Sequence, residues 1–163
     1  MGATVLAFKI PEYEFEPEPV TAEECGLTED EHDIIRRIYK GETTKDIAIG
    51  VHLSVEQTKT EIKRIRRKLD LGNRIAVASF AARNKWFPDI FHKSQDVAMF
   101  KPTIKQRLLM AGVSAGLSTA QIAIVNDISE ETANSNLDAI YRQTGVHSRV
   151  LLARIAIEQG WVK

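Results

Sequence analysis

The side chains best suited to chemistry lie in one stretch, residues 55–68, which reads VEQTKTEIKRIRRK. Six bases stand against two acids in it, so its net charge is +4. Apolar or small side chains recur there at spacings of four, three and four, which predicts one buried stripe of a helix: Thr58, Ile62, Ile65 and Leu69. The opposite face then carries Lys59, Thr60, Lys63, Arg66 and Arg67. This face is predicted to bind an anion, and the alternative is an ordinary solvated helix face.

The charges of the whole chain are distributed unevenly, although the net charge of its 163 residues is zero. Residues 1–26 carry a net charge of −5, whereas residues 27–87 carry +4. Residues 88–101 are balanced, and residues 102–163 carry +1. Nucleic-acid-binding proteins usually present a basic surface. Neutrality therefore does not exclude nucleic acid here, because it is the average of an acidic head and a basic middle.

Several classes of protein are excluded by what the sequence lacks. No apolar run approaches 18 residues and no signal peptide is recognisable. The single cysteine, Cys25, cannot form an internal disulfide, and four scattered histidines make no metal-ligand cluster. No nucleophile–base set, paired catalytic carboxylates or Gly-rich phosphate loop is present. We expect a cytoplasmic protein that is not an enzyme and that uses no metal, cofactor or small-molecule ligand.

The sequence repeats itself at an offset of 75 residues. Residues 27–86 align with residues 102–161 without a gap, and 14 of the 60 positions are identical. The clearest match is the tripeptide at 47–49, which recurs as Ile122-Ala123-Ile124. A unit of this length that occurs twice predicts two small homologous domains rather than a solenoid.

Each repeat carries signals for four helices. In the first, Thr28 with Glu31 predicts an N-cap, Gly41 an end, Thr43 or Thr44 a second cap, and Ser54 with Gln57 a third. A fourth helix is predicted from Arg74 to Trp86, and the second repeat predicts helices at 103–115, 119–126, 129–143 and 149–160. Two short helices joined by a tight turn are the helix-turn-helix plan, in which the second helix enters the DNA major groove.

The first repeat resembles the helix-turn-helix domain of LuxR/NarL-type (GerE-like) transcription regulators. The positions that match are Leu27, Thr28, Glu31, Gly41, Lys45, Ile47, Ala48, Ser54, Lys59, Lys68, Leu69, Asn73 and Arg74. Gln57 and Thr58 depart from the usual Thr-Val, and Asp70 replaces the usual Gly. Region 4 of sigma factors shares much of this pattern.

The second repeat resembles the same family less closely. It keeps Gly116, Ile122, Ala123, Ile128, Ser129, Thr132, Gly145, Val146, Ser148 and Arg149. It departs from the family at Asn134, where Lys is usual, and at Gln143-Thr144, where Lys-Leu is usual. The resemblance implies an all-α chain with two tandem four-helix domains of the LuxR C-terminal type, at 27–87 and 102–163. An acidic, flexible arm (1–26) precedes them and a linker (88–101) joins them.

The resemblance implies a bacterial transcription regulator that binds double-stranded DNA, chiefly through the first repeat. The candidates for reading base edges are Val55, Glu56, Lys59, Thr60 and Lys63. The candidates for phosphate contacts are Thr43, Thr44, Lys45, Gln57, Arg64, Arg67 and Arg74. Arg74 has a competing structural role, because the family arginine at this position often fixes the fourth helix.

The second repeat is predicted to differ in function, because residues 130–143 carry a net charge of −2, which repels phosphates. Either it adds DNA contacts or it binds a protein. Its candidate DNA contacts are Thr119, Asn134, Ser135, Arg142 and Arg149.

The fourth helix commonly forms the dimer contact in this family. The chain is therefore expected to form either a homodimer or an intrachain pseudo-dimer of its two repeats, and the sequence does not distinguish between these two arrangements. One alternative function is a phage-type DNA-packaging or adaptor protein. Another is a regulator that contacts RNA polymerase or a partner regulator. The acidic arm is expected to aid solubility, or to screen the basic first repeat as a mimic of DNA.

Overall fold

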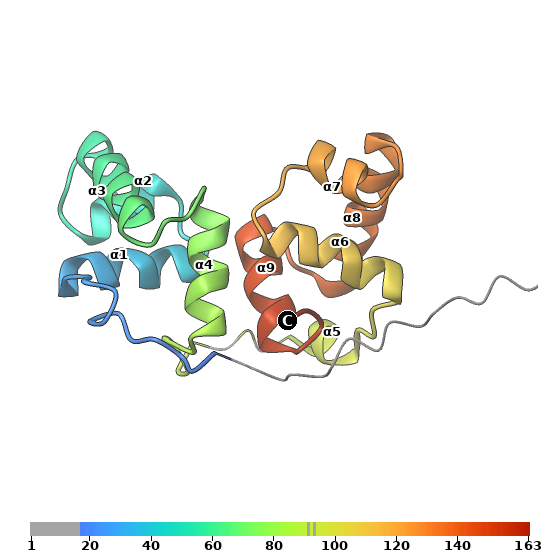
Figure 1. Ribbon diagram of the computed structural model, residues 1–163, viewed down its shortest axis with the longest axis horizontal. Helices are drawn as coiled ribbons and strands as arrows, with labels where there is room; N and C mark the ends of the chain where they lie inside the picture. The colour runs from blue at the N-terminus through green and yellow to red at the C-terminus, as the bar shows by residue number, and fades with distance from the viewer. Residues whose placement is uncertain (1–16, 91, 93) are drawn as a thin grey trace, which may run out of the picture.

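The computed structural model describes residues 17–90, 92 and 94–163, and this part of the chain folds into nine α-helices without a strand (Figure 1). The first repeat contains α1 (Glu29–Tyr39), α2 (Thr44–Gly50), α3 (Val55–Lys68) and α4 (Arg74–Arg83). The second contains α6 (Ile104–Ser114), α7 (Thr119–Val125), α8 (Glu130–Thr144) and α9 (Arg149–Glu158). A short helix, α5 (Gln95–Met99), lies between them. The all-α fold with two helix-turn-helix units is confirmed.

Capping boxes start most of these helices, as the sequence predicted. Thr28 accepts a hydrogen bond from the amide of Glu31, and the Glu31 carboxylate accepts one from the amide of Thr28. Ser54 and Gln57 do the same at the start of α3. Of the two candidates for α2, Thr43 is the N-cap and pairs with Asp46. These reciprocal bonds satisfy amides that a helix start leaves unpaired, so three-residue motifs fix where the helices begin.

Two boundaries differ from prediction. The fourth helix ends at Arg83 rather than Trp86, because Lys85 adopts a left-handed conformation with φ of 54°. Residues 88–101, predicted as a linker, contain α5, whose Val97 is buried in the second core. Asp70 stands where the family usually has a glycine, and its backbone conformation explains why aspartate is tolerated there. Asp70 has φ of 54°, close to the 67° of its counterpart Gly145, and aspartate tolerates this region better than most residues.

The two repeats pack against each other through their fourth helices. Figure 1 shows α4 and α9 side by side at the centre, with α2–α3 and α7–α8 at the top of the view on either side of them. Val150 of α9 is buried in the first core, while Ile75 of α4 and Ile157 of α9 contact both cores. The Asn73 amide donates to the carbonyl of Gly116 at 2.7 Å and so adds a polar link. The repeats therefore form one unit with a shared apolar seam.

The predicted arm is attached to the first repeat in its described part. The Trp86 indole donates to the carbonyl of Val20 at 2.6 Å, and the amide of Val20 donates to the Asn84 side chain at 2.9 Å. These contacts lie beyond the C-terminal end of α4, so Trp86 anchors the chain there. Residues 1–16 of the arm lie outside the described residues, and so does the flexibility predicted for them. Among the described residues, no helix is long and apolar enough to cross a membrane.

Candidate nucleic-acid interface

The exposed face of α3 presents all five residues predicted to read bases. Val55, Glu56, Lys59, Thr60 and Lys63 are exposed, and Thr58, Ile62 and Ile65 are buried against the first core. The predicted stripe of apolar residues is therefore confirmed as the side that holds α3 in place. Lys59 forms an ion pair with Glu56 at 2.7 Å, and the Thr60 hydroxyl donates to the carbonyl of Glu56. The Glu56 carboxylate thus neutralises one of the two lysines on this face.

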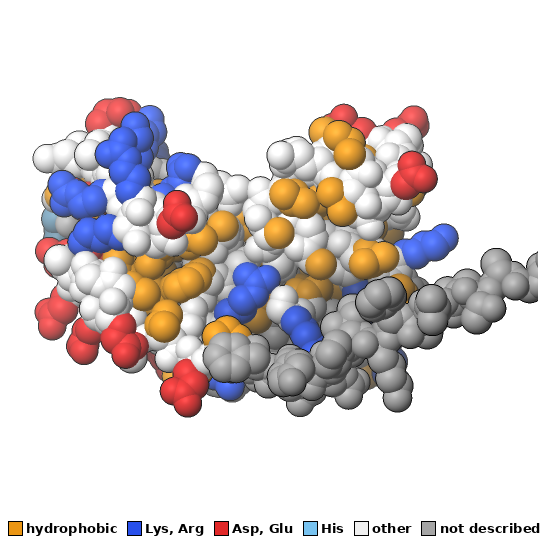
Figure 2. Space-filling model, viewed as in Figure 1, with side chains coloured by type: hydrophobic (Ala, Val, Ile, Leu, Met, Phe, Trp, Pro, Cys, Tyr) orange, Lys and Arg blue, Asp and Glu red, His pale blue; other side chains and the backbone are white. Residues whose placement is uncertain are grey.

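Further cations lie beside this face. Arg64 and Arg67 are exposed, and Figure 2 shows lysine and arginine side chains gathered over α3. Arg64 forms an ion pair with Glu61 at 3.1 Å, which leaves Lys63 and Arg67 without a carboxylate partner within the described ranges. Unpaired cations lose no existing ion pair when they meet a phosphate, so these two side chains gain most from an anion.

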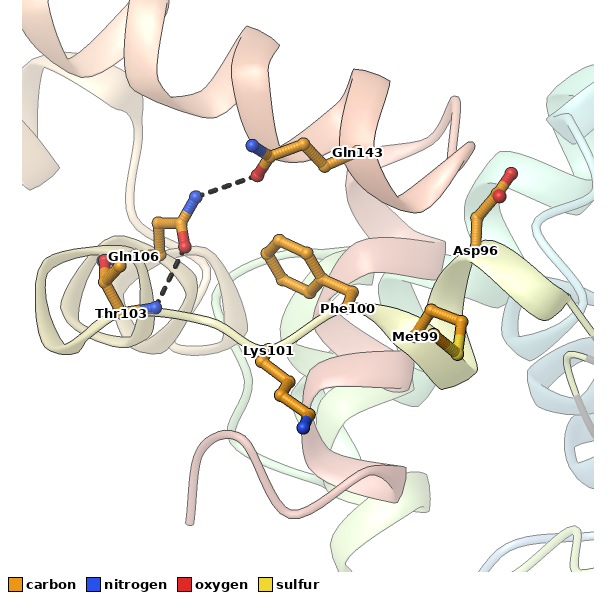
Figure 3. Close-up of a pocket in the computed structure, with 7 residues that line it drawn as sticks. All are labelled: Asp96, Met99, Phe100, Lys101, Thr103, Gln106 and Gln143. Atoms are coloured by element: carbon orange, nitrogen blue, oxygen red, sulfur yellow. Dashed lines mark hydrogen bonds between the residues drawn. The ribbon is translucent and has the colours of Figure 1, made fainter.

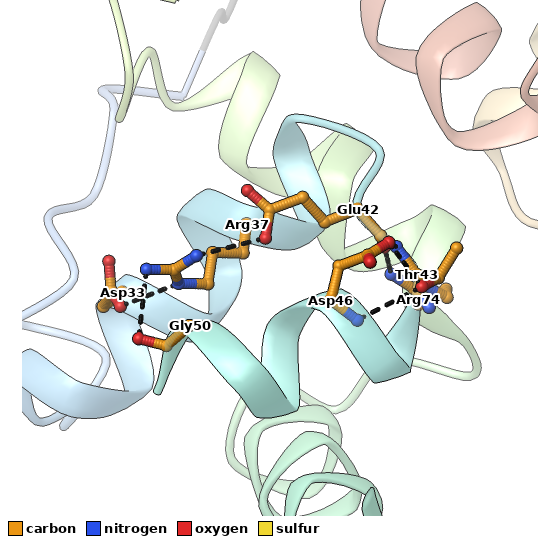
Figure 4. A network of polar contacts seen from close by, with 7 residues as sticks. All are labelled: Asp33, Arg37, Glu42, Thr43, Asp46, Gly50 and Arg74. Carbon is orange, nitrogen blue, oxygen red and sulfur yellow. Dashed lines mark hydrogen bonds and ion pairs between the residues drawn. The ribbon is translucent and has the colours of Figure 1, made fainter. Parts of the chain in front are cut away.

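A half-buried arginine, Arg37, holds α2 against α1. Figure 4 shows Arg37 of α1 reaching towards α2, where its guanidinium donates to the carbonyl of Gly50 at 3.3 Å. It also pairs with Asp33 at 3.1 Å and with Glu42 at 3.2 Å. The hydrogen bond that Arg37 donates to Asp33, together with the one that it donates to Glu42, raises the pKa of the Arg37 guanidinium against the opposing effect of burial. Sequence analysis missed Arg37, because no local motif marks its contact thirteen residues away.

Arg74 lies at the opposite end of α2 and connects α4 to it. Its guanidinium donates to the carbonyl of Glu42 at 2.6 Å and reaches the Thr44 hydroxyl at 3.4 Å. Burial lowers the pKa of this guanidinium. Arg149 repeats the arrangement in the second repeat, with 2.6 Å to the carbonyl of Leu117 and 3.2 Å to the Thr119 hydroxyl. Of the two roles expected for Arg74, these contacts favour the structural one.

The remaining phosphate candidates lie at the starts of α2 and α3. Lys45 is exposed in the first turn of α2, and Thr43 is engaged in the capping box with Asp46. The Gln57 side-chain oxygen is likewise engaged with the amide of Ser54, although the side chain is exposed. The structure therefore brings Lys45, Gln57 and Arg67 to the surface and commits Thr43 and Thr44 partly to contacts inside the repeat.

Lys68, at the end of α3, makes contacts inside the first repeat and is not available to bind an anion. Its ammonium pairs at 2.7 Å with Glu31, whose side chain is 4% exposed, and donates to the carbonyl of Gly26 at 3.0 Å. The pair joins the end of α3 to the start of α1. Arg66 similarly donates to the carbonyl of Gly72. The basic stretch is thus divided between binding and structural side chains, which charge counting cannot separate.

The α8 helix presents the equivalent face of the second repeat with different chemistry. Asn134, Ser135 and Arg142 are exposed, whereas Thr119 and Arg149 are half-buried in the contact described above. At an offset of 75 residues, Lys59 becomes Asn134, Lys63 becomes Asp138 and Arg64 becomes Ala139. Glu130 and Glu131 are exposed in the first turn of α8. Of the cations on α3, only Arg67 keeps a counterpart, Arg142.

Exposed apolar side chains accompany these acids. Ile124 and Val125, at the end of α7, are 78% and 73% exposed. Figure 2 shows hydrophobic side chains with acidic ones at the top of the second repeat, where the first repeat shows basic ones. The two helix-turn-helix units therefore share a backbone plan and differ in surface chemistry.

A buried polar network crosses the seam between the repeats. Arg154 of α9 is 2% exposed, and its guanidinium donates to the carbonyl of Tyr39 at 2.7 Å. Its Nε lies 3.0 Å from Glu158 Oε1, an ion pair without hydrogen-bond geometry, and the Tyr39 hydroxyl donates to the same carboxylate. Burial and Glu158 raise the pKa of the Tyr39 phenol. The residue of the first repeat that corresponds to Arg154 is a serine at position 79. Comparison of the repeats therefore did not reveal this network, and sequence analysis missed it.

A shallow depression lies away from these faces, where α5 and the start of α6 meet the end of α8. Figure 3 shows Gln106 donating to Gln143 across it, at 3.0 Å. The other side chains that line it are Asp96, Met99, Phe100, Lys101 and Thr103. In the described ranges, no group of three or more His, Cys, Asp or Glu side chains is placed to hold a metal ion.

One family model matches the chain, and it does so twice. It is GerE, described as bacterial regulatory proteins of the luxR family, and it matches residues 26–81 and 103–156. The two matches cover both helix-turn-helix units and about two thirds of the chain. No match was found among curated proteins or among solved structures.

Proposed function

Because the chain belongs to the luxR family of bacterial regulatory proteins and is a DNA-binding regulator, we propose that it recognises a specific DNA sequence chiefly through α3. The observation that carries this proposal is the exposed face of α3, where Lys63 and Arg67 lack a carboxylate partner among the described residues. Val55, Glu56, Lys59, Thr60 and Lys63 contact base edges in the major groove. The site of action is the cytoplasm, where bacterial DNA is found.

Phosphate contacts are made by a smaller set of residues than the sequence suggested. Lys45, Gln57, Arg64 and Arg67 are exposed and flank the reading face. Thr43 and Thr44 lie at the start of α2, where the positive end of the helix dipole adds to the effect of their hydroxyls. Arg74 acts as a positioning residue, since its guanidinium already bonds to Glu42 and Thr44. Removal of Arg74 would disturb DNA binding through the placement of α2.

The pairing of α4 with α9 supplies within one chain the contact that the family commonly makes between two. Both units then face the same side, as Figure 1 shows, and meet half-sites about one helical turn apart. The second unit carries three exposed acids on α8, which phosphates repel. Asn134, Ser135 and Arg142 are its remaining means of contacting DNA. Its acidic and apolar surface favours protein contact as its main role.

The experiment is a titration of a DNA duplex, selected by binding from a randomised pool, with the wild type and with Lys59→Ala plus Lys63→Ala. We expect the variant to lose at least about tenfold in affinity, since each good contact to a base edge contributes about 1–3 kcal/mol. Lys101→Ala plus Lys105→Ala is the matched control, because both lysines are exposed and lie before or at the start of α6, outside α2–α3 and α7–α8. Unchanged binding by the first variant would overturn the proposal.

A further inference from the structure

An unpartnered face lies on the second helix-turn-helix unit. Ile124 and Val125 at the end of α7 are 78% and 73% exposed, and α7 packs directly against α8. Glu130, Glu131 and Asp138 are exposed on α8. We call these five residues the acidic face. Covering apolar side chains that are this exposed with a partner removes apolar surface from water, which is favourable.

The first unit offers a surface of opposite charge. Lys59, Lys63, Arg64 and Arg67 are exposed on α3, with Val55 at its start. We call these five residues the basic face. Ile49, at the end of α2, is 67% exposed beside it and is the repeat counterpart of Ile124. Each face thus combines exposed apolar groups with charges of one sign, and the signs are opposite.

The geometry prevents the two faces of one chain from meeting. The α4–α9 seam fixes the two units side by side, and α3 and α7–α8, which carry the two faces, lie at the top of the view on either side of this seam (Figure 1). The acidic face of one molecule can, however, meet the basic face of another. The zero net charge of the chain favours this approach, because copies do not repel one another at long range.

We propose that the acidic face binds the basic face of a second copy of this chain, so that copies associate head to tail. Such an interface is heterologous: a pair of copies still has one free face of each sign, one on each copy, and further copies can add. The association rests on opposite charges at the surface and is therefore weak and sensitive to salt. It covers α3. If α3 reads DNA as proposed above, self-association and DNA compete for the same residues.

The test is sedimentation velocity of the full chain without DNA, so its outcome does not depend on the proposed function. We expect the weight-average sedimentation coefficient to rise with protein concentration at about 0.05 M salt. Raising the salt to about 0.5 M should weaken association at least about tenfold, because the Debye length falls well below 10 Å. A chain that stays monomeric at low salt, or whose association is indifferent to salt, overturns the proposal.

Charge reversal identifies the faces. Glu131→Lys plus Asp138→Lys, and separately Lys59→Glu plus Lys63→Glu, should each abolish association. The variant that carries all four substitutions should associate again, because it restores opposite signs at a net charge of zero. Lys101→Glu plus Lys105→Glu is the control for altered net charge and should retain more association than Lys59→Glu plus Lys63→Glu. Circular dichroism checks that each variant is folded. Failure of the fourfold variant to recover association would overturn the assignment of these faces.

Discussion

Two arginines of the first repeat show how the same side chain serves different ends. Arg67 is exposed on α3 and has no carboxylate partner among the described residues. Arg74 is half-buried and donates to the carbonyl of Glu42 at 2.6 Å. A guanidinium that already satisfies buried acceptors cannot leave them for a phosphate without cost. We therefore expect the two residues to act on different measurable quantities.

Arg67→Ala should reduce the slope of log affinity against log salt by about one, because one phosphate contact is lost. Its free energy of unfolding should change by less than about 0.5 kcal/mol, as for most exposed sites. Arg74→Ala should instead lower the free energy of unfolding by about 1–3 kcal/mol, because it leaves Glu42 and Thr44 unpaired. Denaturant unfolding and DNA titration at several salt concentrations measure both quantities. A wild-type stability for Arg74→Ala, with a reduced slope, would place Arg74 at a phosphate instead.

At the scale of the helices, Glu31 performs two tasks with one carboxylate. It completes the capping box that starts α1 and pairs with Lys68 at the end of α3. Burial acts to raise the pKa of this carboxyl. The hydrogen bonds from Lys68 and Thr28 outweigh it, so the pKa is lowered. The side chain thus joins a locally determined helix start to a contact between elements.

The lowered pKa makes this contact sensitive to acid. A carboxyl whose pKa is lower in the folded state contributes stability above its unfolded pKa, and this stability is lost as the pH falls through the folded pKa. Glu31→Gln should therefore lower the free energy of unfolding by about 1–3 kcal/mol at pH 7 and reduce the loss of stability below about pH 4.

Urea unfolding of both proteins between about pH 3 and pH 7 measures this effect. Glu29→Gln is the control, since Glu29 lies in the same first turn and is exposed. Parallel pH profiles for Glu31→Gln and the wild type would contradict the role given to the pair.

At the scale of the whole molecule, the seam between α4 and α9 decides how the two units are arranged. Ile75 and Ile157 join the two cores, and the buried Arg154 bonds to Tyr39 across the seam. This network has no symmetric copy, because position 79, the counterpart of Arg154, is a serine. A seam formed by two second repeats would place two Arg154 side chains near each other without Tyr39. The network thus favours unlike repeats as partners.

Arg154→Ala should lower the free energy of unfolding by about 3–5 kcal/mol, because it leaves a largely buried Glu158 carboxylate without its cation. We expect the wild type to unfold in one transition and this variant to show two, one for each repeat. Adding Glu158→Ala should cost less than the sum of the single changes.

Calorimetry with matched circular dichroism measures these transitions. Arg83→Ala is the control, since Arg83 is exposed and crosses the seam only to the carbonyl of Lys163. A single transition for Arg154→Ala at wild-type stability would show that the apolar seam alone joins the repeats.

The sequence by itself determined the two repeats, the capped helix starts and the basic face of α3. These features are encoded within a few residues: Thr28 and Glu31 are three positions apart, and Thr58, Ile62 and Ile65 share one helical stripe. The division of the basic stretch was not accessible in the same way. Lys68 and Arg66 look like Lys63 and Arg67 in the sequence, and only their neighbours in space distinguish them.

Only the tertiary structure decided that α4 packs on α9 within one chain, and that Arg74 holds α2. It also revealed the network in which Arg154 contacts Tyr39, 115 positions earlier in the chain. The physical reason is that such contacts depend on how whole helices pack, and packing is set by the combined shape of two cores. Local spacing fixes which side of a helix is apolar, but not which other helix will cover it.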